Sequence, residues 1–279
     1  MRDAYAHCER LVQEGDKDRY LADLFAPAAA RPHLFALHAF NAEVAAVRER
    51  ISGSMAGEIR LQWWRDALAG NAASGAEGNP VAAALDDTIV RKGLPRDRLI
   101  GLIEARSFDL YDDIMRSREA FDGYLQATAA ALFEIAGLIL GGERGSVAQA
   151  AMPAGIAYGV TGLLRALPLH ASRRQIFFPL DLLEEFGVRP ETVLAGNSSA
   201  ALLAVLSHLR AKGRTAQAEA RAHSAQLPQA IRPAFLPLAL VDGYLRPMDR
   251  ADYEPFKTPV NVPQWRRQWT LWRAARRGG

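Results

Sequence analysis

The chain has 279 residues, of which 49% are hydrophobic, so it is long and apolar enough to bury a sizeable core. Its formal charge is +3, and removing the five arginines of the last fifteen residues from the 34 basic residues leaves 29 against 31 acids, which excludes a global basic footprint for nucleic acid. The single cysteine, Cys8, excludes an internal disulfide and Cys-rich metal sites, and it fits a reducing cytosol.

No leading signal sequence and no twenty-residue uncharged apolar run is present, so we expect a soluble, cytoplasmic protein. Apolar residues recur every three to four positions and strict strand alternation is scarce, which predicts an all-α fold. We find no internal repeat and predict a single domain over residues 1–279, with a basic, Trp-rich tail at 263–279.

Helices are predicted along the whole chain. The first covers residues 2–14, the second runs from Tyr20 to just before Pro27, and a long third begins at Pro32 and reaches toward Ile51. Gly70 to Pro80 is rich in Gly, Ala and Asn and is interpreted as a surface loop. The remaining predicted helices are 59–68, 81–92, 96–114, 118–140, 146–167, 179–186, 198–226 and 230–249, the last interrupted or restarted near Pro237.

Two kinds of polar residue interrupt the apolar helices. Glu43 lies on an otherwise apolar stretch, and because a buried carboxylate is unfavourable unless paired, one interpretation is a structural salt bridge with Arg19, Arg48 or Arg165. His38 and His170 belong to no His-x-x-x-His or Glu-x-x-His pattern, which favours core or surface histidines over metal ligands.

Asp109, Asp112 and Asp113 would share one face of the helix predicted at 96–114. Three carboxylates at that spacing could chelate a cation. A solvated acidic face is the more common meaning of such a run, and it is the interpretation that we favour.

The stretch from Val160 to Leu183 changes character in its middle. It opens as an apolar helix that we expect to end near Pro168, passes through a basic segment, and becomes apolar again at Phe177, Phe178 and Pro179. Its arginines could bind a phosphate through bidentate forks, or could cap helix carbonyls and pair with Glu184 and Glu185. The residues concerned are Arg165, Arg173 and Arg174, with Lys257 as a distant addition.

Three tryptophans of the tail fall on one helical face, since Trp265, Trp269 and Trp272 are spaced i, i+4 and i+7. Arginines on the flanks of such a face suit a membrane surface, where rings lie at headgroup level and guanidinium groups meet phosphates. The alternative is that the tryptophans dock on the protein's own core, which Arg276 on the same face favours. The flanking arginines are Arg266, Arg267, Arg273 and Arg277.

Two of these stretches together resemble the signatures of the squalene and phytoene synthase family. The run 34–37, Leu-Phe-Ala-Leu, matches the lead-in to the first aspartate-rich motif, and Phe177-Phe178-Pro179 stands where the second signature has Tyr-Leu-Pro. Arg165 keeps the family's arginine, Tyr124 matches a tyrosine of the middle helix, and residues 61–64 resemble its Leu-x-x-Trp segment.

The resemblance implies an isoprenoid-synthase-like helical bundle around a central cavity, in which Glu43 and Arg165 lie on facing helices near the mouth. It also implies where magnesium would be held, because paired aspartates tether the ions beside a diphosphate. Only Glu43 of the first motif is acidic here, and the aspartates of the second are Ala166 and His170, so we expect no metal site. The ligand-binding residues that the resemblance implies for a vestigial cavity are Glu43, Tyr124, Arg165, Arg173 and Arg174.

Within the family, residues 41–43, 164–166 and 168–174 are most similar to an aspartate-poor subgroup that includes the mitochondrial assembly factor for respiratory complex I. That similarity implies a non-catalytic protein that binds a protein partner, such as a respiratory complex subunit, or an isoprenoid or lipid. The tail adds the expectation of a peripheral position on the inner face of the membrane. The alternative is an enzyme that condenses two prenyl diphosphates head to head with magnesium as cofactor, using Glu43, Asp109 and Arg165.

Overall fold

In the computed structural model, which describes residues 1–51, 53–70 and 78–277, these residues form helices and connecting turns and include no strand. Within these ranges one isolated parallel bridge joins Ile114 to Ile176. The all-α prediction is confirmed.

The N-terminal helices agree with the predicted pattern except at one break. The helix expected to run from Pro32 toward Ile51 is two helices, because Ala46 leaves the helical conformation with φ −88° and ψ 3°. Of the loop predicted from Gly70 to Pro80, residues 71–77 lie outside the described part of the chain. The helices are α1 (Arg2–Gly15), α2 (Lys17–Asp23), α3 (Arg31–Ala45), α4 (Val47–Arg50), α5 (Ser54–Leu68) and α6 (Pro80–Lys92).

The helix predicted at 96–114 is wrong in its second half. It ends at Arg106 as α7 (Arg96–Arg106), and a 3-10 turn, Ser107–Leu110, follows. The backbone carbonyl of Asp109 accepts hydrogen bonds from the side chains of Arg48 and Gln175, so it does not continue a helical ladder. Asp109, Asp112 and Asp113 therefore do not share a helical face.

The helix predicted at 118–140 contains an irregular turn. The chain forms α8 (Arg118–Leu125), a π-helical segment (Gln126–Ala130) and α9 (Ala131–Ile139). Inside the π-helical segment the Thr128 hydroxyl donates to the carbonyl of Tyr124 at 2.6 Å, a side-chain bond of the kind that bends helices.

Helix α10 (Arg144–Ser172) is longer than predicted, because it continues through Pro168. Proline removes one backbone donor and crowds the preceding turn, but α10 packs along its length against other helices, which offsets that cost. As a result Arg165 and His170, which we expected on either side of a helix end, belong to one helix.

The last third of the chain holds one helix that was not predicted, α12, which is only five residues long. The region 230–249 is interrupted, as expected. Its elements, with the neighbouring helices, are α11 (Leu180–Glu185), α12 (Pro190–Leu194), α13 (Ala200–Ser224), a 3-10 segment (Arg232–Leu240), α14 (Val241–Leu245), a 3-10 turn (Arg246–Asp249) and α15 (Gln264–Arg276).

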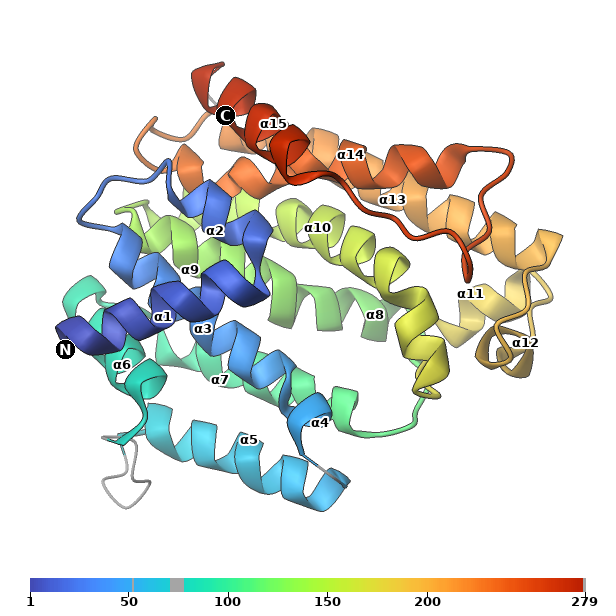
Figure 1. The fold of residues 1–279 in the computed structure, drawn as a ribbon, viewed down its shortest axis with the longest axis horizontal. Coiled ribbons are helices and arrows are strands. Elements are labelled where there is room, and N and C mark those ends of the chain that lie inside the picture. The colour runs from blue at the N-terminus through green and yellow to red at the C-terminus, as the bar shows by residue number, and fades with distance from the viewer. Residues whose placement is uncertain (52, 71–77, 278–279) are drawn as a thin grey trace.

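Helix α10 runs through the middle of the molecule and packs on α13, on α9 and on the π-helical segment (Figure 1). In the described ranges it is the one helix long and apolar enough to cross a membrane, but 56% of its most apolar stretch is buried inside the protein. The helix contacts neighbouring backbone at Gly155, where an added Cβ would lie 2.3 Å from the backbone nitrogen of Ala130. Only glycine permits this contact.

We therefore predict that Gly155→Ala lowers the free energy of unfolding by at least about 2 kcal/mol, because backbone cannot move aside as a side chain can. Gly162 of the same helix is the matched control, since an added Cβ there meets nothing within 4 Å. Gly162→Ala should leave stability unchanged or raise it by up to about 1 kcal/mol. Urea unfolding followed by circular dichroism measures both, and equal effects would contradict the close contact.

Candidate functional site

The positions where the resemblance calls for aspartates lie on α3, at its end, and on α10. Ala42, Ala46, Ala166 and His170 are all half-buried there, and Glu43 is the one carboxylate among them. Magnesium prefers several oxygen ligands, which alanine and imidazole do not supply. In the described part of the chain no three His, Cys, Asp or Glu side chains come together as metal ligands. The residues at these positions do not fit magnesium.

Glu43 is held by an arginine that the sequence did not single out. Its carboxylate lies 3.2 Å from the guanidinium group of Arg60 on α5, and its side chain is only 14% exposed. The salt-bridge interpretation is right in kind and wrong in partner. The three arginines expected as its partners, Arg19, Arg48 and Arg165, make other contacts.

Glu43 and Arg165, which we expected near the mouth of a cavity, have different partners. Glu43 is close to Cys8 on α1, whose thiol has a pKa raised to about 12 by burial and by the Glu43 carboxylate. Arg165 instead places its guanidinium group 3.7 Å from the ring centroid of Tyr244 on α14. Glu43 is therefore close to residues of α1 and α5, whereas Arg165 contacts α14.

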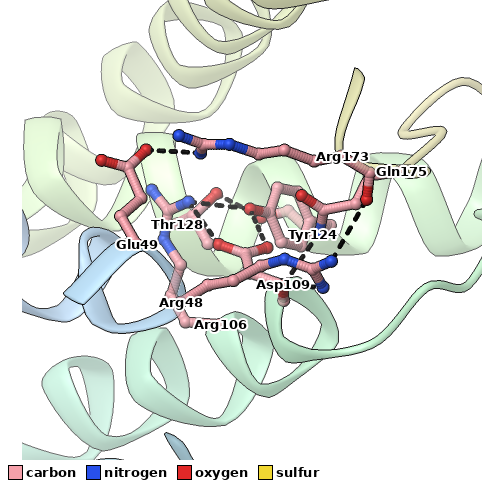
Figure 2. A network of polar contacts seen from close by, with 8 residues as sticks. All are labelled: Arg48, Glu49, Arg106, Asp109, Tyr124, Thr128, Arg173 and Gln175. Atoms are coloured by element: carbon pink, nitrogen blue, oxygen red, sulfur yellow. Dashed lines mark hydrogen bonds and ion pairs between the residues drawn. The ribbon is translucent and has the colours of Figure 1, made fainter. Parts of the chain in front are cut away.

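A compact triangle of hydrogen bonds joins Arg106, Asp109 and Tyr124 (Figure 2). Arg106 donates to the Asp109 carboxylate at 2.9 Å and to the Tyr124 hydroxyl at 2.8 Å, and Tyr124 donates to Asp109 at 2.7 Å. Burial raises the pKa of Tyr124 well above 10, so its hydroxyl keeps its proton. Burial opposes the charge of Arg106, but Tyr124 and Asp109 outweigh it and raise its pKa.

Arg48 joins this triangle to two other segments. It donates to the carbonyl of Asp109 at 3.1 Å, to the carboxylate of Asp112 at 2.5 Å and to the carbonyl of Arg173 at 3.2 Å. The end of α4, the loop after α7 and the end of α10 therefore meet at one guanidinium group. The acidic residues predicted to form a solvated helical face thus lie in a loop, where Asp109 and Asp112 form internal pairs.

Arg173 also pairs with Glu49 at 2.6 Å, which completes the network in Figure 2. Arg174 is exposed, has a positive φ of 58°, and is not part of the network. Lys257, the distant candidate, pairs with Glu254 at 2.6 Å on the surface. Of the arginines considered for phosphate binding, Arg173 is thus neutralised within the protein.

His170 is in an apolar and cationic environment. Its ring lies 4.5 Å from that of Phe177, which also contacts Phe108 and Tyr124. Burial, with the positive charges of Arg173 and Arg106, lowers the pKa of His170 to about 4. The imidazole is therefore neutral near pH 7. His38 is a core histidine, hydrogen-bonded at 2.8 Å to Asp23.

A second buried network ties the C-terminal helix to the domain. Asp18 on α2 accepts a hydrogen bond from Tyr244 at 2.6 Å and pairs with Arg267 of α15 at 2.9 Å. Leu271, one turn further along, is fully buried. Arg267, which we expected at a membrane surface, therefore points inward, because a buried Asp18 needs a cation.

The tryptophans of α15 face the opposite way. Trp265, Trp269 and Trp272 are 62%, 54% and 37% exposed, so the alternative in which they dock on the protein's own core is wrong. The helix itself is docked, through Arg267 and Leu271. Removing the tail would therefore uncover core residues.

Sequence reasoning missed three charged residues: Arg106 and Asp18, which hold the two networks together, and Arg60, which pairs with Glu43. Each is a charged residue beside apolar helical positions, and that pattern is the signal that was available. Tyr124 and Arg173, which were selected from the resemblance, belong to one network with Asp109. Arg165 belongs to the other, through Tyr244.

Comparison with known proteins gives a consistent result. A family model described as squalene/phytoene synthase matches residues 12–273. The rat protein named NADH dehydrogenase (ubiquinone) complex I, assembly factor 6 is 30% identical over 254 residues, which cover 91% of this chain and 76% of that protein. A chloroplastic phytoene synthase of Narcissus pseudonarcissus is 25% identical over 277 residues, which cover 96% of this chain and 64% of the plant protein.

Among solved structures, a crystal structure of a dehydrosqualene synthase in complex with ligand is similar in fold. It has a TM-score of 0.86 at 16% identity and covers 99% of this chain and 96% of the other. At that identity the likeness concerns the fold alone.

The triangle around Arg106 predicts a strong difference between two aspartates three residues apart. Asp109→Ala leaves the charge of Arg106, whose side chain is only 20% exposed, without its carboxylate and should lower the free energy of unfolding by about 2–4 kcal/mol. Asp112→Ala is the control, because its side chain is 56% exposed and its pairing with Arg48 should contribute at most about 1 kcal/mol. Urea unfolding of both variants is the measurement, and similar losses would contradict the buried pairing.

The pKa of His170 predicts a defined pH dependence. Because this pKa falls from 6.5 in the unfolded chain to about 4 in the fold, the unfolded state binds more protons between these values. The stability of wild type relative to His170→Gln should be constant above pH 6.5 and fall by on the order of 2–3 kcal/mol as the pH drops to about 4. Urea unfolding across this range tests it, and parallel curves for the two proteins would refute the neutral, buried imidazole.

Proposed function

The chain belongs to the squalene/phytoene synthase family, and from that premise we propose that it is a non-catalytic member that assists the assembly of a respiratory complex by binding a protein partner. The single observation that carries the proposal is the set of residues at the metal-binding positions. Where an enzyme of this kind would tether magnesium, Ala42, Ala46, Ala166 and His170 supply no carboxylate.

The charges around these positions support the same proposal. A diphosphate needs cations or metal ions that are free to meet it. Arg48 and Arg173 are instead bonded to Asp112 and Glu49, and Arg106 is bonded to Asp109. Binding a diphosphate here would require several of these internal bonds to break.

The similarity to a complex I assembly factor suggests which process the chain serves. The rat relative is named for assembly of NADH dehydrogenase (ubiquinone) complex I, and the similarity extends over 91% of this chain. The competing proposal, a head-to-head prenyltransferase, has the similarity to phytoene synthase in its favour and needs magnesium chemistry from a site with Glu43 alone.

The catalytic alternative is tested with geranylgeranyl and farnesyl diphosphate. Purified protein, incubated with either diphosphate and magnesium, should form no condensed product and should show no magnesium-dependent rise in melting temperature. A phytoene synthase assayed in parallel is the positive control. Magnesium-dependent stabilisation that is lost in Glu43→Ala would overturn the proposal and favour the transferase.

The assembly role is tested in the organism that encodes the chain. Deleting the gene should reduce assembled respiratory complex I on native gels, and wild type and Glu43→Gln should restore it equally, because the glutamine keeps a hydrogen-bond acceptor for Arg60. A transferase that uses Glu43 would lose function in that variant. Normal complex I in the deletion strain would contradict the assembly role.

A further inference from the structure

The outward face of α15 carries an unusual cluster of aromatic and cationic groups. Trp269 and Trp272 stack with ring centroids 4.9 Å apart, and Trp265 lies one turn before them. Arg266 lies over the Trp265 ring at 5.1 Å and Arg276 over the Trp272 ring at 4.3 Å. Exposing such large aromatic rings to water is unfavourable, which indicates that this face is a binding surface.

This face cannot turn inward, because the opposite side of the helix is fixed. Arg267 pairs with the buried Asp18, and Leu271 is fully buried beside it. The tryptophans are thus held outside by the same contacts that dock the helix. In Figure 1, α15 lies along one edge of the molecule and α5 along the opposite edge.

A cavity of about 510 Å³ adjoins the tryptophan face, between α15 and the segments of α13, α14 and residues 232–240 beneath it. Its lining contains five arginines against one acid, Asp242, which pairs with Arg221 at 3.2 Å. Trp269 also lines it, so the cationic cavity and the aromatic face meet at that residue. The other arginines of the lining are Arg232, Arg246, Arg273 and Arg277.

Exposed apolar residues extend the surface at the far end of α15. Phe25 is 38% exposed and lines a second cavity, of about 570 Å³, together with Ala275. Leu24, beside it in the chain, is also exposed. Exposed aromatic and apolar side chains thus continue past the end of the tryptophan cluster, while the arginines line the first cavity.

The tryptophan face of α15, the arginine-lined cavity and Phe25 together form one surface. We propose that this surface docks the protein on an anionic phospholipid bilayer. The tryptophans and Phe25 lie at the level of the headgroups, and the arginine-lined cavity takes the phosphate of a lipid headgroup. The charge pattern favours this occupant, because residues 264–277 carry five arginines and no acid, and Arg267 alone is neutralised by Asp18. Aromatic side chains beside guanidinium groups match the boundary between acyl chains and phosphates.

The docking is peripheral. Helix α15 has thirteen residues, too few to span a bilayer, and its inner side is occupied by the protein. Its attraction to anionic lipid is in part electrostatic, so salt should weaken it. The cavity and the tryptophans act together, since neither alone provides both the apolar and the charged contact.

The test is sedimentation of the full chain with vesicles of phosphatidylcholine alone or mixed with phosphatidylglycerol. Wild type should bind the mixed vesicles and not the pure ones. One basic side chain near an anionic surface strengthens binding about fivefold, so Arg273→Gln with Arg277→Gln should weaken it roughly thirtyfold. The matched control is the pair Arg116→Gln with Arg189→Gln, two exposed arginines outside the surface, which should change binding by less than about twofold.

The aromatic part has its own variants and readout. Trp269→Ala with Trp272→Ala should weaken binding by at least roughly tenfold, and Met55→Ala with Ile59→Ala, exposed apolar residues of α5, should not. In wild type, lipids brominated near the headgroup end of their acyl chains should quench tryptophan fluorescence, which reports rings at the boundary between headgroups and acyl chains. Circular dichroism melts verify that all variants remain folded.

Four outcomes would overturn the proposal. Equal binding to both kinds of vesicle removes the role of the arginines, and an unchanged affinity in the tryptophan pair removes that of the rings. Competition by inorganic phosphate at the concentration of lipid phosphate would assign the cavity to a free anion. Polyglutamate binding in preference to vesicles would assign the surface to an acidic protein.

Discussion

The guanidinium group of Arg106 is largely withdrawn from water and needs acceptors within the protein, and the arrangement of several segments follows from that requirement. Asp109 and Tyr124 provide the acceptors. The chain leaves α7 directly after Arg106, and this places the Asp109 carbonyl where Arg48 reaches it. Through Arg48 the end of α10 is joined to the same point. In this protein, therefore, the end of the bundle that would handle a diphosphate is cross-linked by its own charges.

The sequence predicts most of the fold because most helices have an amphipathic pattern and clear ends. Helices α1 and α6 lie within one or two residues of prediction, and α6 has its N-cap at Asn79 and a left-handed Gly93 at its end. The helix ends that were predicted at the wrong residues are determined by tertiary contacts. Packing of α10 carries it through Pro168, and side-chain bonds to the Asp109 carbonyl end the helix that was predicted to reach residue 114. No local pattern contains that information.

The candidate site is less predictable from the sequence, because it depends on which charged residues pair with one another in the fold. A buried Glu43 requires a cation, and the sequence offers many; the one used, Arg60, lies seventeen positions away on a separate helix. The resemblance selects Tyr124 and Arg173 correctly as members of a polar cluster, since the family's topology brings their segments together. It does not reveal that their charges are satisfied internally. The outward tryptophans follow from helical spacing, but the inward turn of Arg267 depends on Asp18, 249 positions earlier.

That long separation has a consequence for biosynthesis. Helix α2 leaves the ribosome before the two groups that bond Asp18, because Tyr244 follows it by 226 positions and Arg267 by 249. Until then the Asp18 carboxylate keeps its water, and α2 cannot take its final packing. Contacts that close such long loops form slowly and leave apolar surface open to other chains. Synthesis of the segment that carries Tyr244 and Arg267, rather than emergence of the first helices, therefore completes the native packing of α2.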